Sequence, residues 1–227
     1  MDLKKQKSYQ QALEMAIKEI RSLDPVRMAE QSGGFYEEKG GKPAITLLFW
    51  GAPYCITFPE IQISSPEKYI VSLVTRIVLL HYLIRADGTE RKGEPIPYKE
   101  IPGGMMYAPV FQKRVVDPLV RVFGNDSEAF LQAGIAIKGE RTRFGDISFV
   151  LKALPRVSIT FVLWRGDEEF PPSIQILFER SIDRYLSLED VVVLGEMAAR
   201  RLIAQKSQEK KADPPGVFGA QRPRHLG

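Results

Sequence analysis

Two groups of short strand-like runs constrain the fold of this 227-residue chain more than any other feature. Each group contains three runs rich in β-branched and aromatic residues, and each run is bounded by glycine, proline or charged turn residues. Runs joined by such short connections pair as antiparallel neighbours, because a parallel pair needs a long crossover. The six runs are Phe35–Glu38, Ala44–Trp50, Tyr54–Phe58, Asp146–Leu154, Val157–Trp164 and Ser173–Phe178. The sequence therefore predicts two β-meanders.

Helical patterns precede, separate and follow the meanders. Apolar residues recur at helical spacing over residues 8–22, Ser65 and Pro66 form a cap before a helix over 67–85, and a capping box at Ser187 begins a helix that ends near Gln205. This order predicts an α+β fold, a single domain with a mostly antiparallel sheet built from the two β-meanders and flanked by helices. The two meanders could be halves of one sheet.

Positive charge is concentrated at the two ends of the chain. The formal net charge is +4, yet residues 1–7 carry three lysines against one aspartate, and residues 206–227 carry five basic against two acidic residues. The body is close to neutral and has no basic patch interleaved with aromatic residues, so we expect no nucleic-acid binding. We divide the chain into a basic N-terminal segment (1–8), one α+β domain (9–205) and a disordered, basic and proline-rich tail (206–227).

Targeting and redox signals are sparse. The N-terminal residues contain no apolar signal region, and the longest apolar stretch, Tyr69–Ile84, is interrupted by Arg76 and His81 and is too short to span a bilayer. We therefore expect a cytoplasmic protein that does not insert into a membrane. The only cysteine, Cys55, excludes a disulfide framework and an iron–sulfur cluster built from the chain's own thiolates.

Standard catalytic motifs are missing from the sequence. It contains no phosphate-binding P-loop, no G-x-G-x-x-G, no G-x-S-x-G, no H-E-x-x-H and no C-x-x-C. A nucleophilic triad would have to use His81, which lies within a predicted buried helix, so nucleophilic hydrolysis is disfavoured. The longest unpatterned segment, residues 87–104, is rich in glycine, proline and charge, and it is a candidate binding loop.

His81 is the only histidine in the predicted domain. The simplest interpretation is a core histidine whose ring nitrogen bonds to a neighbouring carboxylate or carbonyl. Two alternatives remain open, axial ligation of a metal in a tetrapyrrole and a role in an ion pair or proton transfer, because neutral imidazole is a common ligand for zinc, iron and cobalt.

A diglycine followed by aromatic residues and an arginine forms a second candidate site. Tyr107 and Phe111 are four residues apart on a predicted helix, and Arg114 lies almost one turn further on. The N–H groups of Gly103 and Gly104, near the start of this helix, and the arginine fork are suited to an anion. The alternative is a loop-to-helix turn whose aromatic side chains fill the core.

The connection Trp164–Pro172 carries three consecutive carboxylates, Asp167–Glu169, and is stiffened by two prolines. Carboxylates held in a stiff loop can bind a cation, bind a partner's arginine or act as a general base. The simpler interpretation is a solvated acidic turn with one carboxylate paired to Arg156 or Arg165.

Four phrases carry a resemblance to a known family. In chain order they are LLHYL (79–83), IPGGMMYAPVFQKR (101–114), LPRV (154–157) and LWRGDEEFPP (163–172). Together they resemble the uncharacterised prokaryotic family known as domain of unknown function 3786, over about residues 9–204. Ser158 and Glu179 depart from the residues that are usual in this family. The resemblance implies a protein typical of anaerobic bacteria and archaea, with no established activity.

Some members of that family carry an added four-cysteine iron–sulfur domain of the kind found on corrinoid proteins, which this chain lacks. The preferred hypothesis is therefore a cytoplasmic binding or accessory protein that takes a small-molecule or cofactor ligand, haem or a corrinoid, or assists a metalloprotein partner in anaerobic metabolism. The alternatives are an enzyme that uses the loop carboxylates on an anionic small molecule, and a protein-interaction adaptor. The preferred hypothesis expects the 87–114 segment, His81 and the acidic connection to surround one cleft. Candidate ligand-binding residues are His81 (also the metal candidate), Tyr82, Gly103, Gly104, Tyr107, Phe111, Arg114, Arg156, Trp164, Asp167, Glu168 and Glu169.

Overall fold

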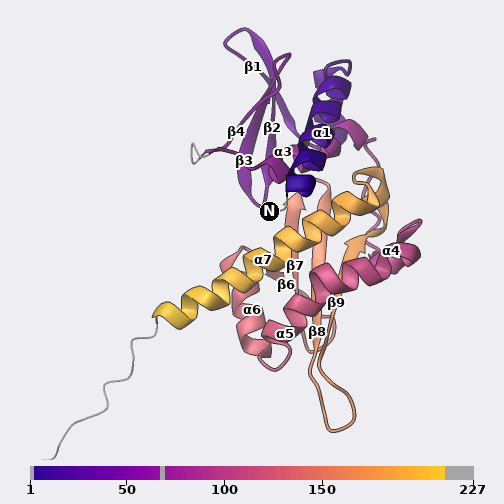
Figure 1. The fold of residues 1–227 in the computed structure, drawn as a ribbon, viewed down its shortest axis with the longest axis vertical. Helices are drawn as coiled ribbons and strands as arrows, with labels where there is room; N and C mark the ends of the chain where they lie inside the picture. Colours follow the sequence, from indigo (N-terminus) through magenta and orange to yellow (C-terminus); the bar gives the residue numbers. More distant parts are fainter. Residues whose placement is uncertain (1–2, 67–69, 213–227) are drawn as a thin grey trace, which may run out of the picture.

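The computed structural model describes residues 3–66 and 70–212 and has the predicted α+β architecture (Figure 1). The helices are α1 (Leu3–Ile20), α2 (Pro25–Ser32), α3 (Leu73–Arg85), α4 (Gly104–Phe111), α5 (Asp117–Phe123), α6 (Ser127–Ala136) and α7 (Leu188–Ala212). The strands are β1 (Phe35–Lys39), β2 (Lys42–Phe49), β3 (Ala52–Thr57), β4 (Gln62–Ser64), β5 (Pro95–Pro97), β6 (Glu140–Arg141), β7 (Ile147–Leu154), β8 (Val157–Trp164) and β9 (Ser173–Glu179). Within these described ranges, no helix is both long and apolar enough to cross a bilayer.

The two predicted meanders form two separate antiparallel sheets. The first has the strand order β1-β2-β3-β4 and the second β5-β9-β8-β7-β6. The short strands β4 and β6 pair with the outer edges of β3 and β7, and among the described residues no strand of the first sheet pairs with a strand of the second. The backbone N–H of Trp50, just after β2, donates to the carbonyl of Ala153 in β7 at 2.9 Å, and this bond ties the first sheet to the second.

The tight hairpin between β1 and β2 follows from two glycines. Gly40 and Gly41 have φ angles of +60° and +74°, the left-handed conformations that a two-residue hairpin turn needs. This turn fixes the register of β1 on β2, with Lys39 opposite Lys42 and Phe35 opposite Thr46. The alternation of buried and exposed residues along the second half of β2 then directs one face of the sheet into the core, where β1 and β2 contact α2.

The second sheet forms the centre of the core. Strands β7 and β8 are buried along most of their length, and the rings of Phe130, Phe149 and Phe161 pack together with centroids 5.0 to 6.5 Å apart. Helices α4 to α7 lie in front of this sheet, and α7 runs diagonally across it (Figure 1). Gly134 in α6 permits close packing, because a Cβ there would lie 2.7 Å from the ring of Phe149.

Three helix ends differ from the prediction. Helix α3 begins at Leu73 with Ser72 as its cap, whose hydroxyl accepts from the N–H of Thr75. The start predicted at residue 67 lies outside the described residues, and residues 70–72 are not helical. Helix α1 begins at Leu3, so most of the predicted N-terminal segment is helical. Helix α7 continues past Gln205 to Ala212, whereas 213–227 lie outside the described residues.

Lys206 shows why the last helix does not end at the predicted position. Its ammonium donates to the carbonyl of Val122 and to the carboxylate of Asp126, both at 2.8 Å. Only 17% of the Lys206 side chain is exposed. Residue 206 therefore belongs to the folded domain and joins α7 to the α5–α6 turn.

Candidate functional site

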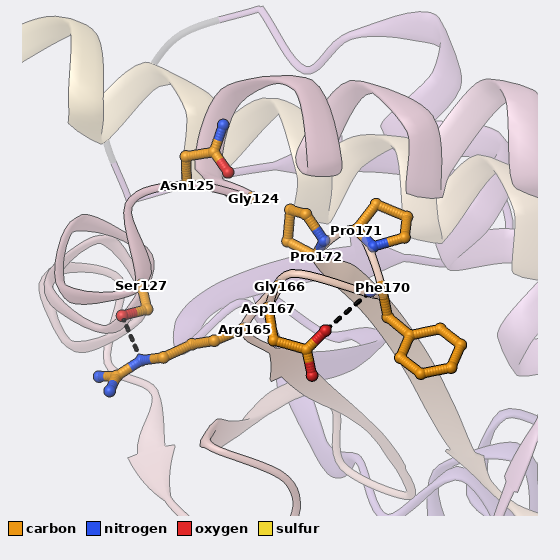
Figure 2. A pocket seen from close by; sticks show the side chains of 9 residues that line it. All are labelled: Gly124, Asn125, Ser127, Arg165, Gly166, Asp167, Phe170, Pro171 and Pro172. Atoms are coloured by element: carbon orange, nitrogen blue, oxygen red, sulfur yellow. Dashed lines mark hydrogen bonds between the residues drawn. The ribbon is translucent and has the colours of Figure 1, made fainter.

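The acidic loop, residues 165–172, joins β8 to β9 and is held in shape by its own first carboxylate. The Asp167 carboxylate accepts from the backbone N–H of Phe170 at 2.7 Å (Figure 2). It also accepts from the N–H of Glu169 at 2.9 Å, and the Asp167 N–H donates to the Phe170 carbonyl. The hydrogen bonds to the carboxylate lower the pKa of Asp167 below its usual value because they favour the charged form, and the bond from Phe170 has the largest effect. Asp167 therefore forms the turn.

The acidic loop packs against the α5–α6 turn, and a pocket of about 360 Å³ lies between them. Gly124 allows the close approach of the turn to the loop, because a Cβ there would lie 3.1 Å from Pro172 Cγ. Gly166 lets the loop fold back on itself, because its Cβ would lie 2.7 Å from Pro172 Cδ. The lining residues are Gly124, Asn125, Ser127, Arg165, Gly166, Asp167, Phe170, Pro171 and Pro172 (Figure 2).

The predicted pairing of a loop carboxylate with an arginine does not occur among the described residues. The Arg165 side chain donates to the hydroxyl of Ser127 at 3.0 Å, and Arg156 lies at the opposite end of β8. Glu168 and Glu169 are exposed and do not line the pocket. The three carboxylates therefore do not converge, as a general base or a cation site built from them would require, whereas Phe170 presents a ring that is 66% exposed.

His81 is bonded to a carboxylate on another helix. Its Nδ1 lies 2.8 Å from Oδ1 of Asp190 in α7, and Asp190 is 5% exposed. The other Asp190 oxygen accepts from the hydroxyl of Ser187 at 2.5 Å, which is a contact within the capping box at the start of α7. Asp190 therefore both caps this helix and orients the histidine. This hydrogen bond raises the pKa of His81 above 6.5, although burial of the ring acts in the opposite direction.

The imidazole borders a pocket of about 230 Å³ between α1, α3 and α7, which we call the His81 pocket. About 30% of the His81 side chain is exposed, and Nε2 has no hydrogen-bond partner among the described residues. Half of the lining residues are aliphatic, and the others carry hydroxyl, imidazole or carboxylate groups. The lining residues are Ser8, Tyr9, Ala12, Val74, Ile77, Val78, His81, Glu189, Asp190 and Val193.

Arg114 is already paired, so its guanidinium is not a free anion-binding group. Its Nε and Nη2 donate to both oxygens of Glu196 at 2.7 and 3.1 Å, and Nη1 donates to Glu189 at 2.9 Å. These charged hydrogen bonds raise the pKa of Arg114, and the bond with Glu196 has the largest effect. The arginine lies in a π-helical segment, Gln112–Val116, which joins α4 to α5 and packs on α7.

The diglycine segment fits the loop-to-helix interpretation. Gly103 has φ +79°, and Gly104 lies so close to the carbonyl of Tyr98 that no side chain could be accommodated there. The Phe111 ring stacks on Tyr98 with centroids 4.4 Å apart, inside the core, whereas Tyr107 is 49% exposed. The predicted aromatic pair is therefore divided between core and surface.

Tyr82 and Arg156 connect distant segments of the core. The Tyr82 hydroxyl donates to the carbonyl of Ser32 at 2.5 Å and accepts from the N–H of Arg156 at 3.1 Å. Burial of the Tyr82 ring raises the pKa of its hydroxyl. The Arg156 side chain packs against Gly33, and Trp164 is 38% exposed at the end of β8. Neither Tyr82 nor Arg156 lines one of the pockets described above.

The candidates therefore do not surround one cleft. The His81 pocket belongs to α1, α3 and α7, whereas the acidic loop lies between β9 and the α5–α6 turn. Sequence reasoning missed Asp190, because the capping box marks it as a helix start and gives no sign of a partner 109 residues away. Among residues 3–66 and 70–212, no group of three or more His, Cys, Asp and Glu side chains could hold a metal ion.

The fold and the site together define a class of protein: an α+β domain of two antiparallel sheets, with a histidine pocket lined by helices. A family model described as "Domain of unknown function (DUF3786)" matches residues 24–201, and the chain belongs to this family. Neither the curated proteins nor the solved structures contain a match to the chain.

Proposed function

We propose that this protein is a non-catalytic binding or accessory protein whose ligand site is the His81 pocket, and that the ligand is a metal tetrapyrrole, haem or a corrinoid. The observation that carries the proposal is the His81–Asp190 pair at a pocket wall. Asp190 accepts from Nδ1–H at 2.8 Å, which leaves Nε2 as the nitrogen with a free lone pair. A carboxylate in this position fixes the imidazole tautomer and increases the basicity of the other nitrogen, as it does for many metal-bound histidines.

The composition of the pocket favours a tetrapyrrole over a free metal ion. A free ion needs three or four protein ligands, and the described residues contain no such group. A tetrapyrrole supplies four nitrogens to its metal and needs only one axial imidazole from the protein. The aliphatic wall of Val74, Ile77 and Val193 suits an apolar ring edge. Because the pocket holds about 230 Å³, it would enclose only part of the macrocycle, and the rest would extend beyond the lining residues.

The proposal is tested by visible spectroscopy under nitrogen. Haemin and, separately, hydroxocobalamin are titrated into the protein, and the absorption bands are followed to saturation. We expect a saturable band shift that is lost in His81→Ala and weakened about 10- to 100-fold in Asp190→Asn. His225→Ala, which removes the only other histidine of the chain, is the matched control and should bind as the unmodified protein does. No band shift with either compound, or an equal shift in folded His81→Ala, would refute the proposal.

A further inference from the structure

A third pocket, of about 350 Å³, lies between the long polar loop 87–104 and the 3-10 turn Arg180–Arg184. We call it the basic pocket, and it is separate from both sites described above. Its lining residues are Thr89, Lys92, Ile96, Glu100, Pro102, Arg180, Ser181, Asp183 and Arg184. Three cationic side chains, two carboxylates and two hydroxyl groups are thus brought together from two segments about 90 residues apart in the sequence.

The loop that forms one wall is preorganised. The N–H groups of Lys92 and Gly93 donate to one carboxylate oxygen of Glu179 at 2.9 and 3.0 Å. The Arg180 N–H donates to the carbonyl of Glu94 at 3.1 Å, and β5 pairs with β9 immediately afterwards. These backbone contacts hold the basic pocket in shape before a ligand binds, which reduces the entropy that binding would lose.

Ser181 supplies an independent observation. The residue is 6% exposed, and its hydroxyl has no hydrogen-bond partner among the described residues. A buried polar group without a partner is uncommon in folded proteins, because it has lost its hydrogen bonds to water and has formed none within the protein. A serine hydroxyl changes direction by rotation of one side-chain torsion, so a ligand in the basic pocket can provide the missing partner.

The cations of the basic pocket keep unused donors. Arg180 uses Nε for Glu94 at 2.8 Å, and Arg184 lies 3.7 Å from the nearest Asp87 oxygen, beyond hydrogen-bond distance. The ammonium of Lys92 makes no hydrogen bond to the described residues. Glu100 and Asp183 also line the basic pocket, so its cations outnumber its carboxylates by one. We propose that this pocket binds the phosphate group of a small molecule, since the unused donors of the three cations and the Ser181 hydroxyl exceed what the two oxygens of a carboxylate need and suit a group with three free oxygens.

The test uses the full chain, with inorganic phosphate and acetate as probes, in titration calorimetry at low ionic strength. We expect saturable phosphate binding, little acetate binding, and at least a tenfold loss of phosphate affinity in Arg180→Ala/Arg184→Ala. Arg143→Ala removes an exposed charge between β6 and β7 and is the matched control, which should keep the affinity. Absence of saturable binding, an equal response to acetate, or an equal loss in Arg143→Ala would overturn the proposal.

Two further variants separate ligand contact from a structural role. Ser181→Ala removes a hydroxyl that has no partner in the free protein, so it should leave the unfolding midpoint unchanged or raise it while weakening phosphate binding. Glu94→Gln removes the charge that competes for Arg180 and should strengthen phosphate binding about two- to fivefold. Unchanged phosphate affinity in both variants would contradict the assignment. Because none of these residues lines the His81 pocket, the outcome does not depend on tetrapyrrole binding.

Discussion

The His81–Asp190 pair should make the stability of the protein depend on pH in a defined direction. Folding raises the pKa of His81 above the 6.5 of an exposed histidine, chiefly through the hydrogen bond to Asp190. The folded state therefore binds a proton more tightly than the unfolded state does. The resulting stabilisation is fully present below about pH 6.5 and is lost as the pH rises through the folded-state pKa.

His81→Gln isolates this contribution because an amide is uncharged at every pH. A hydrogen bond to a charged group contributes about 1.5–3 kcal/mol and a neutral one about 0.5–1.5 kcal/mol. The Asp190 side chain is 8% exposed and that of His81 30%. We therefore expect the free energy of unfolding of the original protein to exceed that of the variant by about 1 kcal/mol at pH 5.5, and by much less at pH 9.

Urea unfolding of both proteins at pH 5.5, 7 and 9 measures this difference. At a slope of about 2 kcal/mol/M, 1 kcal/mol corresponds to a midpoint shift of about 0.5 M at pH 5.5. His225→Gln is the control for loss of a histidine as such and should show no pH-dependent difference. A stability difference that stays constant from pH 5.5 to 9, or increases with pH, would show that the charged imidazole is not stabilised by Asp190.

Three further predictions concern packing and surface residues. Gly166→Ala should lower the free energy of unfolding by about 1–3 kcal/mol, since its Cβ would lie 2.7 Å from Pro172 Cδ. Arg114→Ala should lower it by about 2 kcal/mol, because Glu196, 17% exposed, loses both of its charged hydrogen bonds. Phe170→Ser should change it by less than about 0.5 kcal/mol, because the ring is 66% exposed. Urea unfolding at pH 7 checks all three, and a reversed order of Gly166→Ala and Phe170→Ser would refute the packing argument.

Local signals in the sequence predicted local structure well. Asp24 caps α2 by accepting from the N–H of Val26, and Pro25 occupies the first helical position, so an aspartate–proline pair in the sequence marks this helix start. The turn at Gly40 and Gly41 also lies where two adjacent glycines predict it. Such features depend on residues within one turn of each other. They can therefore be predicted from the sequence without knowledge of the tertiary structure.

The candidate sites were less predictable because side-chain partners come from distant segments. Arg114 has the residue type of an anion-binding group, but Glu189 and Glu196, seven residues apart, lie two turns apart on one face of α7 and occupy its donors. His81 has the partner that the simplest interpretation expects, a carboxylate. No local pattern identifies that carboxylate as Asp190, because only the packing of α3 against α7 brings the two together.

The family phrases and the His81 pocket overlap only in part, and this limits what membership of the family implies. Tyr82, Arg156 and Gly104 occur in the phrases and join segments of the core through backbone contacts, so these residues maintain the fold. The match covers residues 24–201 and so includes both His81 and Asp190. Helix α1, which supplies Ser8, Tyr9 and Ala12 to the pocket wall, lies outside the matched range. Membership of the family therefore bears on the histidine–carboxylate pair, whereas the shape of the pocket, and with it the choice of ligand, depends on a helix that the family match does not cover.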